Sequence, residues 1–125
     1  MATLSQKLQL KPGARVRVVG APADLAKELG PAVKDGEAFN TAIVFVDSIA
    51  GIEDAAANIV PRLGRDDLLW FAYRKGAAAK QTGLNRDVGW DAMKAIGWRP
   101  VRAISFNDVW SGIRYRPVDL VKTGR

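Results

Sequence analysis

The stretch TAIVFVD at positions 41–47 has no alternation of apolar and polar residues, and neither has DLLWFAY at positions 67–73. A strand with one face in water alternates, whereas a strand covered on both faces is apolar along its length. Such runs are typical of parallel strands packed between helices. The two stretches therefore predict the interior of a parallel sheet.

Helical segments connect the predicted strands. Residues 49–64 repeat apolar side chains at helical spacing, and Ser48 is placed to cap that helix. Pro61 should bend the helix or end its regular part. Upstream, ARVRVVG at 14–20 reads as a strand, and a short helix beginning at Pro22 follows it.

The C-terminal part changes character. RPVRAISF at 99–106 and VWSGIRYRPV at 109–118 are close enough to form an antiparallel hairpin. We expect a short helix at 3–10 and a fraying tail at about 119–125. Residues 1–125 are then a single α/β domain. Its predicted fold is a reduced Rossmann-like three-layer sandwich of about five strands, mostly parallel with a C-terminal antiparallel hairpin.

The composition excludes several chemistries. The chain has neither cysteine nor histidine, which removes disulfides, thiolate catalysis and the commonest zinc ligands. A general base would have to be a carboxylate, a lysine or a tyrosine with a strongly shifted pKa. No acidic cluster has metal-ligand spacing, so we predict no metal and no cofactor. The N-terminus lacks a secretory signal and no apolar run approaches a membrane span, so a cytoplasmic location without membrane contact is expected.

Four segments carry a resemblance to known families: KLQLKPG at 7–13, VRVVGAP at 16–22, LLWFAYRKG at 68–76 and DVWSGIR at 108–114. Together they resemble small bacterial proteins that share a domain of unknown function, with a KLxLKPG opening and a WSGxR ending. The order of elements is also similar to the later half of the Rossmann-like methyltransferase sheet. The resemblance implies a fold class and supplies no catalytic residues.

The turn after the first strand is where a Rossmann-type fold would hold a cofactor. Gly20 is present, but Pro22 and Leu25 occupy the later glycine positions of G-x-G-x-x-G. The strand that would carry a ribose-binding acid is missing from the pattern. We therefore favour a tight turn over a cofactor site. Asp47 ends a strand at the ligand-binding edge, where it could contact a ligand hydroxyl or a metal. The preferred interpretation is that Asp47 and Ser48 open the next helix and compete to cap it.

The loop RKGAAAKQTGLNRD at 74–87 is the strongest candidate for a ligand site. Lys75 and Lys80 flank small residues, and Asn85 and Arg86 begin a predicted helix whose N-terminus favours anions. From Arg74 onward the chain has eleven basic and four acidic residues, a net charge of +7. A solvated loop that only aids solubility is the equally supported alternative.

In the closing hairpin, strand alternation places Trp110, Gly112, Arg114 and Arg116 on one face. Arginines beside a tryptophan could hold phosphates and stack a base. They could equally form a cation–π pair over the sheet, or a subunit contact. For all of the tryptophans, burial in the core is the safer interpretation.

The leading hypothesis is a non-catalytic module that binds an anionic partner: a nucleotide, a phosphometabolite or nucleic acid. The candidate ligand-binding residues are Lys75, Lys80, Asn85, Arg86, Trp110 and Arg114. The first alternative is a divergent methyltransferase-like enzyme. The second is a structural homo-oligomer, such as a homodimer, without a small ligand.

Overall fold

A computed structural model describes Leu8, Val33 and residues 15–29, 38–64, 67–74, 90–107 and 109–117. Its strands are β1 (Val16–Val19), β2 (Thr41–Val46), β3 (Leu68–Arg74), β4 (Trp98–Ser105) and β5 (Trp110–Pro117). Its helices are α2 (Ala23–Leu29), α3 (Ile49–Asn58), the 3-10 helix η1 (Val60–Arg62) and α5 (Asp91–Ala95). None of these helices is long and apolar enough to cross a bilayer.

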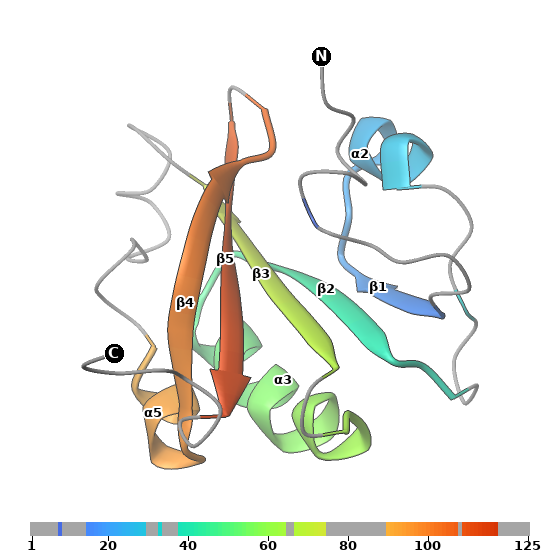
Figure 1. Cartoon of the computed structure of the whole chain (residues 1–125). Helices are drawn as coiled ribbons and strands as arrows, with labels where there is room; N and C mark the ends of the chain where they lie inside the picture. Colours follow the sequence, from blue (N-terminus) through green and yellow to red (C-terminus); the bar gives the residue numbers. More distant parts are fainter. Residues whose placement is uncertain are drawn as a thin grey trace.

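The strands form one sheet in the order β1-β2-β3-β5-β4 (Figure 1). β1, β2 and β3 pair in parallel, and β4 and β5 form the predicted antiparallel hairpin. The expectation of a mostly parallel sheet fits only in part, because β5 pairs antiparallel with β3 as well as with β4. The physical reason is burial: β5 supplies Ile113 and Tyr115 to one core and Trp110 to the other, so it takes the interior position, and the largely exposed β4 lies at the edge.

The central strands separate two hydrophobic cores, which gives the predicted three layers. Every residue of β2 is buried. Ala42 and Val44 pack in the core that contains α3 and α5, here called the α3-side core. Ile43 and Phe45 pack in the core that contains α2 and Leu8, the α2-side core. In Figure 1, α3 and α5 lie together in the lower part of the molecule, away from α2.

The predicted helix signals around α3 are confirmed. Ser48 is the N-cap, and its hydroxyl accepts a hydrogen bond of 3.1 Å from the Gly51 N–H. The α-helix ends at Asn58, and Pro61 lies within η1, as expected for a residue without a backbone N–H. The predicted helix at 3–10 and the tail at 119–125 lie outside the described residues, apart from Leu8.

A glycine in β5 allows the hairpin turn to fold back over the sheet. The ring of Phe106 lies directly against Gly112, and a Cβ at that position would overlap the ring. Phe106 in turn packs edge-to-face against Phe45 at a centroid distance of 5.8 Å. Close approach of this kind requires the absence of a side chain.

We therefore predict that Gly112→Ala lowers the free energy of unfolding by about 1–3 kcal/mol, the usual range for overpacking. Gly51→Ala is the matched control. A Cβ there meets its nearest neighbour at 3.5 Å, and alanine is the better helix former, so stability should stay equal or rise. Urea unfolding of both variants measures this, and equal destabilisation would contradict the account.

A second prediction concerns Tyr115, which is buried against Phe71 and Trp90. Burial raises its pKa well above the ordinary value, nearby Tyr73 adds to the rise, and Arg99 opposes it. Folding thus favours the protonated phenol. The contribution is complete below about pH 10, where an unfolded tyrosine titrates, and declines as the pH rises further. Tyr115→Phe should lose less stability than wild type between pH 9 and 11.5 in urea titrations; identical losses would refute this.

Candidate functional site

The carboxyl ends of the parallel strands form one edge of the sheet. From there the chain passes to one face of the sheet after β1 and to the opposite face after β2. After β1 it enters α2, whose Leu25 and Leu29 belong to the α2-side core. After β2 it enters α3, whose Ile52 and Ala55 belong to the α3-side core. Open α/β sheets bind ligands in the crevice at such a switch point. We call the space between Gly20 at the end of β1 and Asp47 at the end of β2 the crevice.

Gly20 has the conformation that the predicted tight turn requires. Its φ is +73°, a left-handed value that favours glycine. A Cβ at this position would lie 3.2 Å from the carbonyl oxygen of Phe45 on the neighbouring strand. Any residue larger than glycine would therefore be strained at this turn, both by its φ and by its approach to β2.

A polar cavity continues from the crevice along the α3 side of β1. Its volume is about 310 Å³, and Val19, Val46 and Gly51 line the end beside the crevice. We call it the polar groove. Its polar lining residues are Arg17, Asp54, Asn58 and Arg62.

The polar groove was missed in the sequence, although part of its signal is present. Asp54, Asn58 and Arg62 recur every four residues, which places them on one side of α3 and η1. The Asn58 amide donates a 2.8 Å hydrogen bond to the Asp54 carboxylate, and the Arg62 guanidinium lies 4.8 Å from the Phe39 ring centre. Arg17 belongs to β1, and only the folded chain brings it to the same cavity as Asp54, Asn58 and Arg62.

The far side of the crevice holds an ion pair that stacks on a tryptophan. Arg74 Nε donates to Asp47 Oδ1 at 2.8 Å, and its guanidinium carbon lies 4.6 Å from the Trp110 ring centre. The side chains of Arg74 and Asp47 are 38% and 60% exposed. The sequence had suggested Asp47 as a competing cap for α3. Ser48 caps the helix instead, and Asp47 bonds to Arg74. Its carboxylate is held at the strand ends.

Of the predicted ligand residues, the structure describes Trp110 and Arg114. Lys75, Lys80, Asn85 and Arg86 lie outside the described residues, so their role stays a prediction. The predicted common face of Trp110 and Arg114 is confirmed, and Trp110 belongs to the α2-side core with 5% of its surface exposed. Arg114 pairs with Trp70 and Arg102 in mid-sheet, about 13 Å along the strand from Trp110.

Metal binding finds no support in the part of the chain that the structure describes. No group of three or more acidic residues lies close enough there to hold an ion.

No model of a known protein family matches this sequence, and no curated protein matches it by sequence either. Solved structures do match. The ribosomal protein L11 methylase of Lactobacillus delbrueckii subsp. bulgaricus has a TM-score of 0.58 at 12% identity, over 91% of this chain and 75% of its own. The N-methyltransferase NodS of Bradyrhizobium japonicum WM9 has a TM-score of 0.52 at 14% identity, over 93% and 81% of the two chains.

A third match, LepI in complex with SAM, has a TM-score of 0.52 at 12% identity, over 91% of this chain and 39% of its own. The fold is that of the Rossmann-like methyltransferases. The predicted similarity to their sheet is thus confirmed at the level of fold, which is all that identities this low establish. The narrower resemblance to small bacterial proteins with the WSGxR ending stays a prediction.

The ion pair beside the crevice generates a third prediction. Because both partners are partly exposed, a double-mutant cycle with Asp47→Asn and Arg74→Met should give a coupling of about 0.2–1 kcal/mol at low salt. The coupling should shrink in 1 M NaCl, where screening is strong. A cycle between Glu53 and Arg74 is the control and should give none. Absence of coupling between Asp47 and Arg74 at low salt would contradict the described contact.

Proposed function

We propose that this protein is a divergent methyltransferase-like domain that binds S-adenosylmethionine in the crevice and the polar groove. The observation that carries the proposal is the departure of α2 and α3 to opposite faces of the sheet, which creates a switch point between β1 and β2. The fold shared with methyltransferases, and with a protein solved in complex with SAM, supports the same choice of ligand.

The residues of the groove suit the groups of this ligand. Arg17 and Arg62 offer guanidinium groups for a carboxylate, and the Asp54 carboxylate accepts hydrogen bonds from an ammonium or a ribose hydroxyl. Val19 and Val44 provide an apolar floor for the adenine ring. A volume of about 310 Å³ lies at the lower end of the range for small-molecule sites.

The lack of histidine and cysteine is compatible with methyl transfer. When bound, S-adenosylmethionine supplies an already activated methyl group. The protein then contributes binding and orientation, and needs no nucleophile or histidine base of its own. The composition that excludes triad-type hydrolysis therefore leaves this reaction open.

The site departs from the usual cofactor pattern in one respect. Among the described residues, no strand lies outside β1, so the neighbouring strand that commonly carries a ribose-binding acid has no counterpart there. We assign the hydroxyl contacts to Asp54 and to Asp47. The Asp47 carboxylate has acceptor capacity beyond its hydrogen bond from Arg74.

A second candidate is the non-catalytic module for an anionic ligand. It is favoured by Arg102, Arg114 and Arg116 on the hairpin, of which Arg102 and Arg114 are direct cross-strand neighbours. Three guanidinium groups on one hairpin concentrate positive charge, which favours an anionic ligand. The loop residues Lys75, Lys80, Asn85 and Arg86 stay candidates for the same ligand from the sequence. A homodimer without a small ligand stays a further hypothesis.

The fourth prediction is saturable binding of S-adenosylmethionine in titration calorimetry. Asp54→Asn should weaken it by about tenfold or more, because a charged hydrogen-bond acceptor is lost. Glu53→Gln is the matched control, since Glu53 is the exposed neighbour on α3 that does not line the groove. Its affinity should match wild type.

Two results would overturn the proposal. One is the absence of heat with both S-adenosylmethionine and S-adenosylhomocysteine at millimolar concentration. The other is binding that Asp54→Asn and Glu53→Gln leave equally intact. Salt-sensitive binding of oligonucleotides or inorganic polyphosphate in their place would establish the second candidate.

A further inference from the structure

We propose that a second site, an apolar pocket at the opposite edge of the sheet, binds a small aromatic carboxylate. The pocket has a volume of about 360 Å³ and lies between the end of α3 with η1 and the α5–β4 corner. Its lining residues include Val60, Pro61, Leu63, Ile96, Trp98 and Pro117. The amino ends of the strands form this edge, so the pocket is separate from the crevice.

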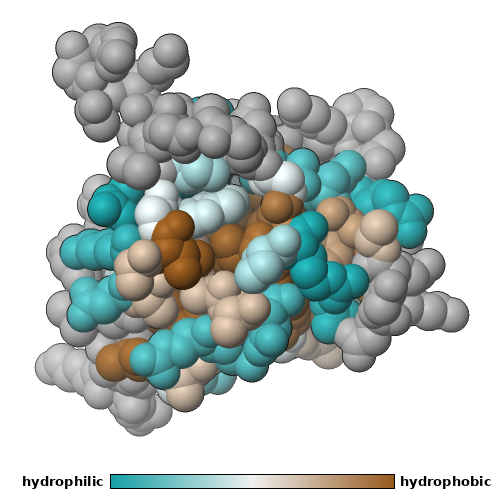
Figure 2. Space-filling view, turned by 90° about the horizontal axis from the view of Figure 1, so that it is seen from below, coloured by the Kyte–Doolittle hydropathy of each residue, from teal (hydrophilic) through white to brown (hydrophobic). Residues whose placement is uncertain are grey.

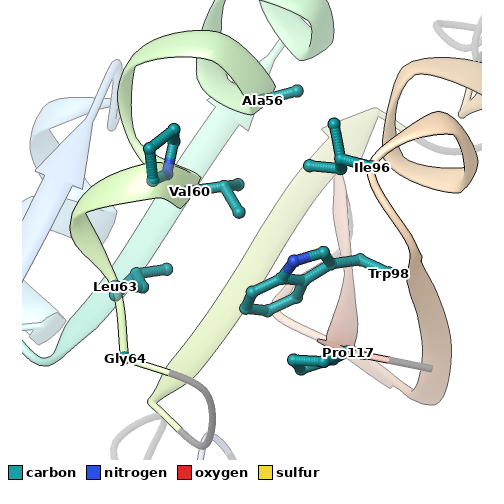
Figure 3. A pocket seen from close by; sticks show the side chains of 8 residues that line it. Ala56, Val60, Leu63, Gly64, Ile96, Trp98 and Pro117 are labelled. Carbon is teal, nitrogen blue, oxygen red and sulfur yellow. The ribbon is translucent and has the colours of Figure 1, made fainter. Parts of the chain in front are cut away.

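Because no charged side chain lines the pocket, we expect the main part of the ligand to be apolar. Figure 2 shows apolar residues gathered in the middle of the underside and framed by hydrophilic ones. Figure 3 shows Val60 and Ile96 turned toward each other across the opening, with the Trp98 ring below them. Ile96 is 43% exposed, a high value for a large aliphatic residue. A flat ring would cover Ile96 and stack on Trp98, and the volume suits one or two fused rings.

The Trp98 indole N–H and the cationic side chains of Arg99 and Lys94 indicate which polar group the ligand carries. In Figure 3 the nitrogen edge of the Trp98 indole is turned toward Val60 and Ile96. Among the described residues this nitrogen has no hydrogen-bond partner, whereas the indole of Trp70 donates to the Leu8 carbonyl at 3.0 Å. A tryptophan N–H in an apolar site normally finds an acceptor.

The cations lie on the α5 side of the pocket. Arg99 Nη1 donates to the carbonyl oxygens of Lys94 and of the lining residue Trp98, at 3.2 and 3.0 Å, which holds the guanidinium at the α5–β4 corner. Lys94 is exposed and lies two residues before the lining residue Ile96. On the other side, the Asp67 carboxylate accepts from the Gly64 N–H at 2.7 Å. An anionic group is therefore favoured at the α5 end and disfavoured at the η1 end.

The test uses naphthalene-2-carboxylate and its neutral counterpart naphthalene-2-methanol, titrated into the full chain by calorimetry. Ile96→Asp should weaken both by about tenfold or more, because it puts a charge at the apolar rim. Ile49→Asp is the matched control: Ile49 is 47% exposed and lies outside the pocket, so affinity should stay within about twofold. Lys94→Gln should weaken the carboxylate by about threefold and leave the alcohol unchanged.

Failure of wild type to bind either probe would overturn the proposal, as would equal binding by the Ile96 and Ile49 variants. If Lys94→Gln weakened the binding of both probes equally, the proposal that the ligand carries an anionic group would be overturned. Sedimentation of wild type and of the Ile96→Asp variant tests whether a second copy of the chain, and not a small molecule, occupies the pocket. A wild-type dimer that becomes a monomer in this variant would mean that a second copy covers the pocket, and would also overturn the proposal.

Discussion

The burial of the β2–β3 pair on both faces is the constraint from which the rest of the structure follows. Neither strand offers a face to water over its apolar length, so protein must cover the sheet on both sides. Two consecutive connections meet this need by taking opposite faces: α2 packs in the core that holds Ile43 and Phe45, and α3 packs in the core that holds Ala42 and Val44. The crevice between β1 and β2 is thus a by-product of hydrophobic coverage.

The same constraint divides the molecule into two chemically different ends. At the carboxyl edge, strand ends bring together Gly20, Asp47 and Arg74, and the polar groove continues from them along β1. At the amino edge, η1 and the α5–β4 corner leave an apolar pocket with Trp98 as its floor. A polar cofactor and a small aromatic acid would therefore occupy opposite ends of one sheet.

Local signals in the sequence predicted much of this fold. The unbroken apolar runs located β2 and β3, Ser48 and Pro61 located the limits of α3, and alternation located the hairpin. The position of β5 between β3 and β4 was not predictable, since it depends on which hairpin strand buries more surface against a distant partner. The candidate site was harder to predict from the sequence than the fold. The row of Asp54, Asn58 and Arg62 is visible as a spacing of four, but its facing residue and the Asp47–Arg74 contact depend on neighbours that only the folded sheet defines.

We propose that the switch point between β1 and β2 is the binding site. An amide-resolved NMR titration with S-adenosylmethionine decides this, because each backbone N–H reports its own surroundings. We expect the largest shifts on Gly20, Asp47, Ser48 and the groove side of α3. Shifts confined to the hairpin arginines, or to the apolar pocket at the amino edge, would show that the ligand binds elsewhere.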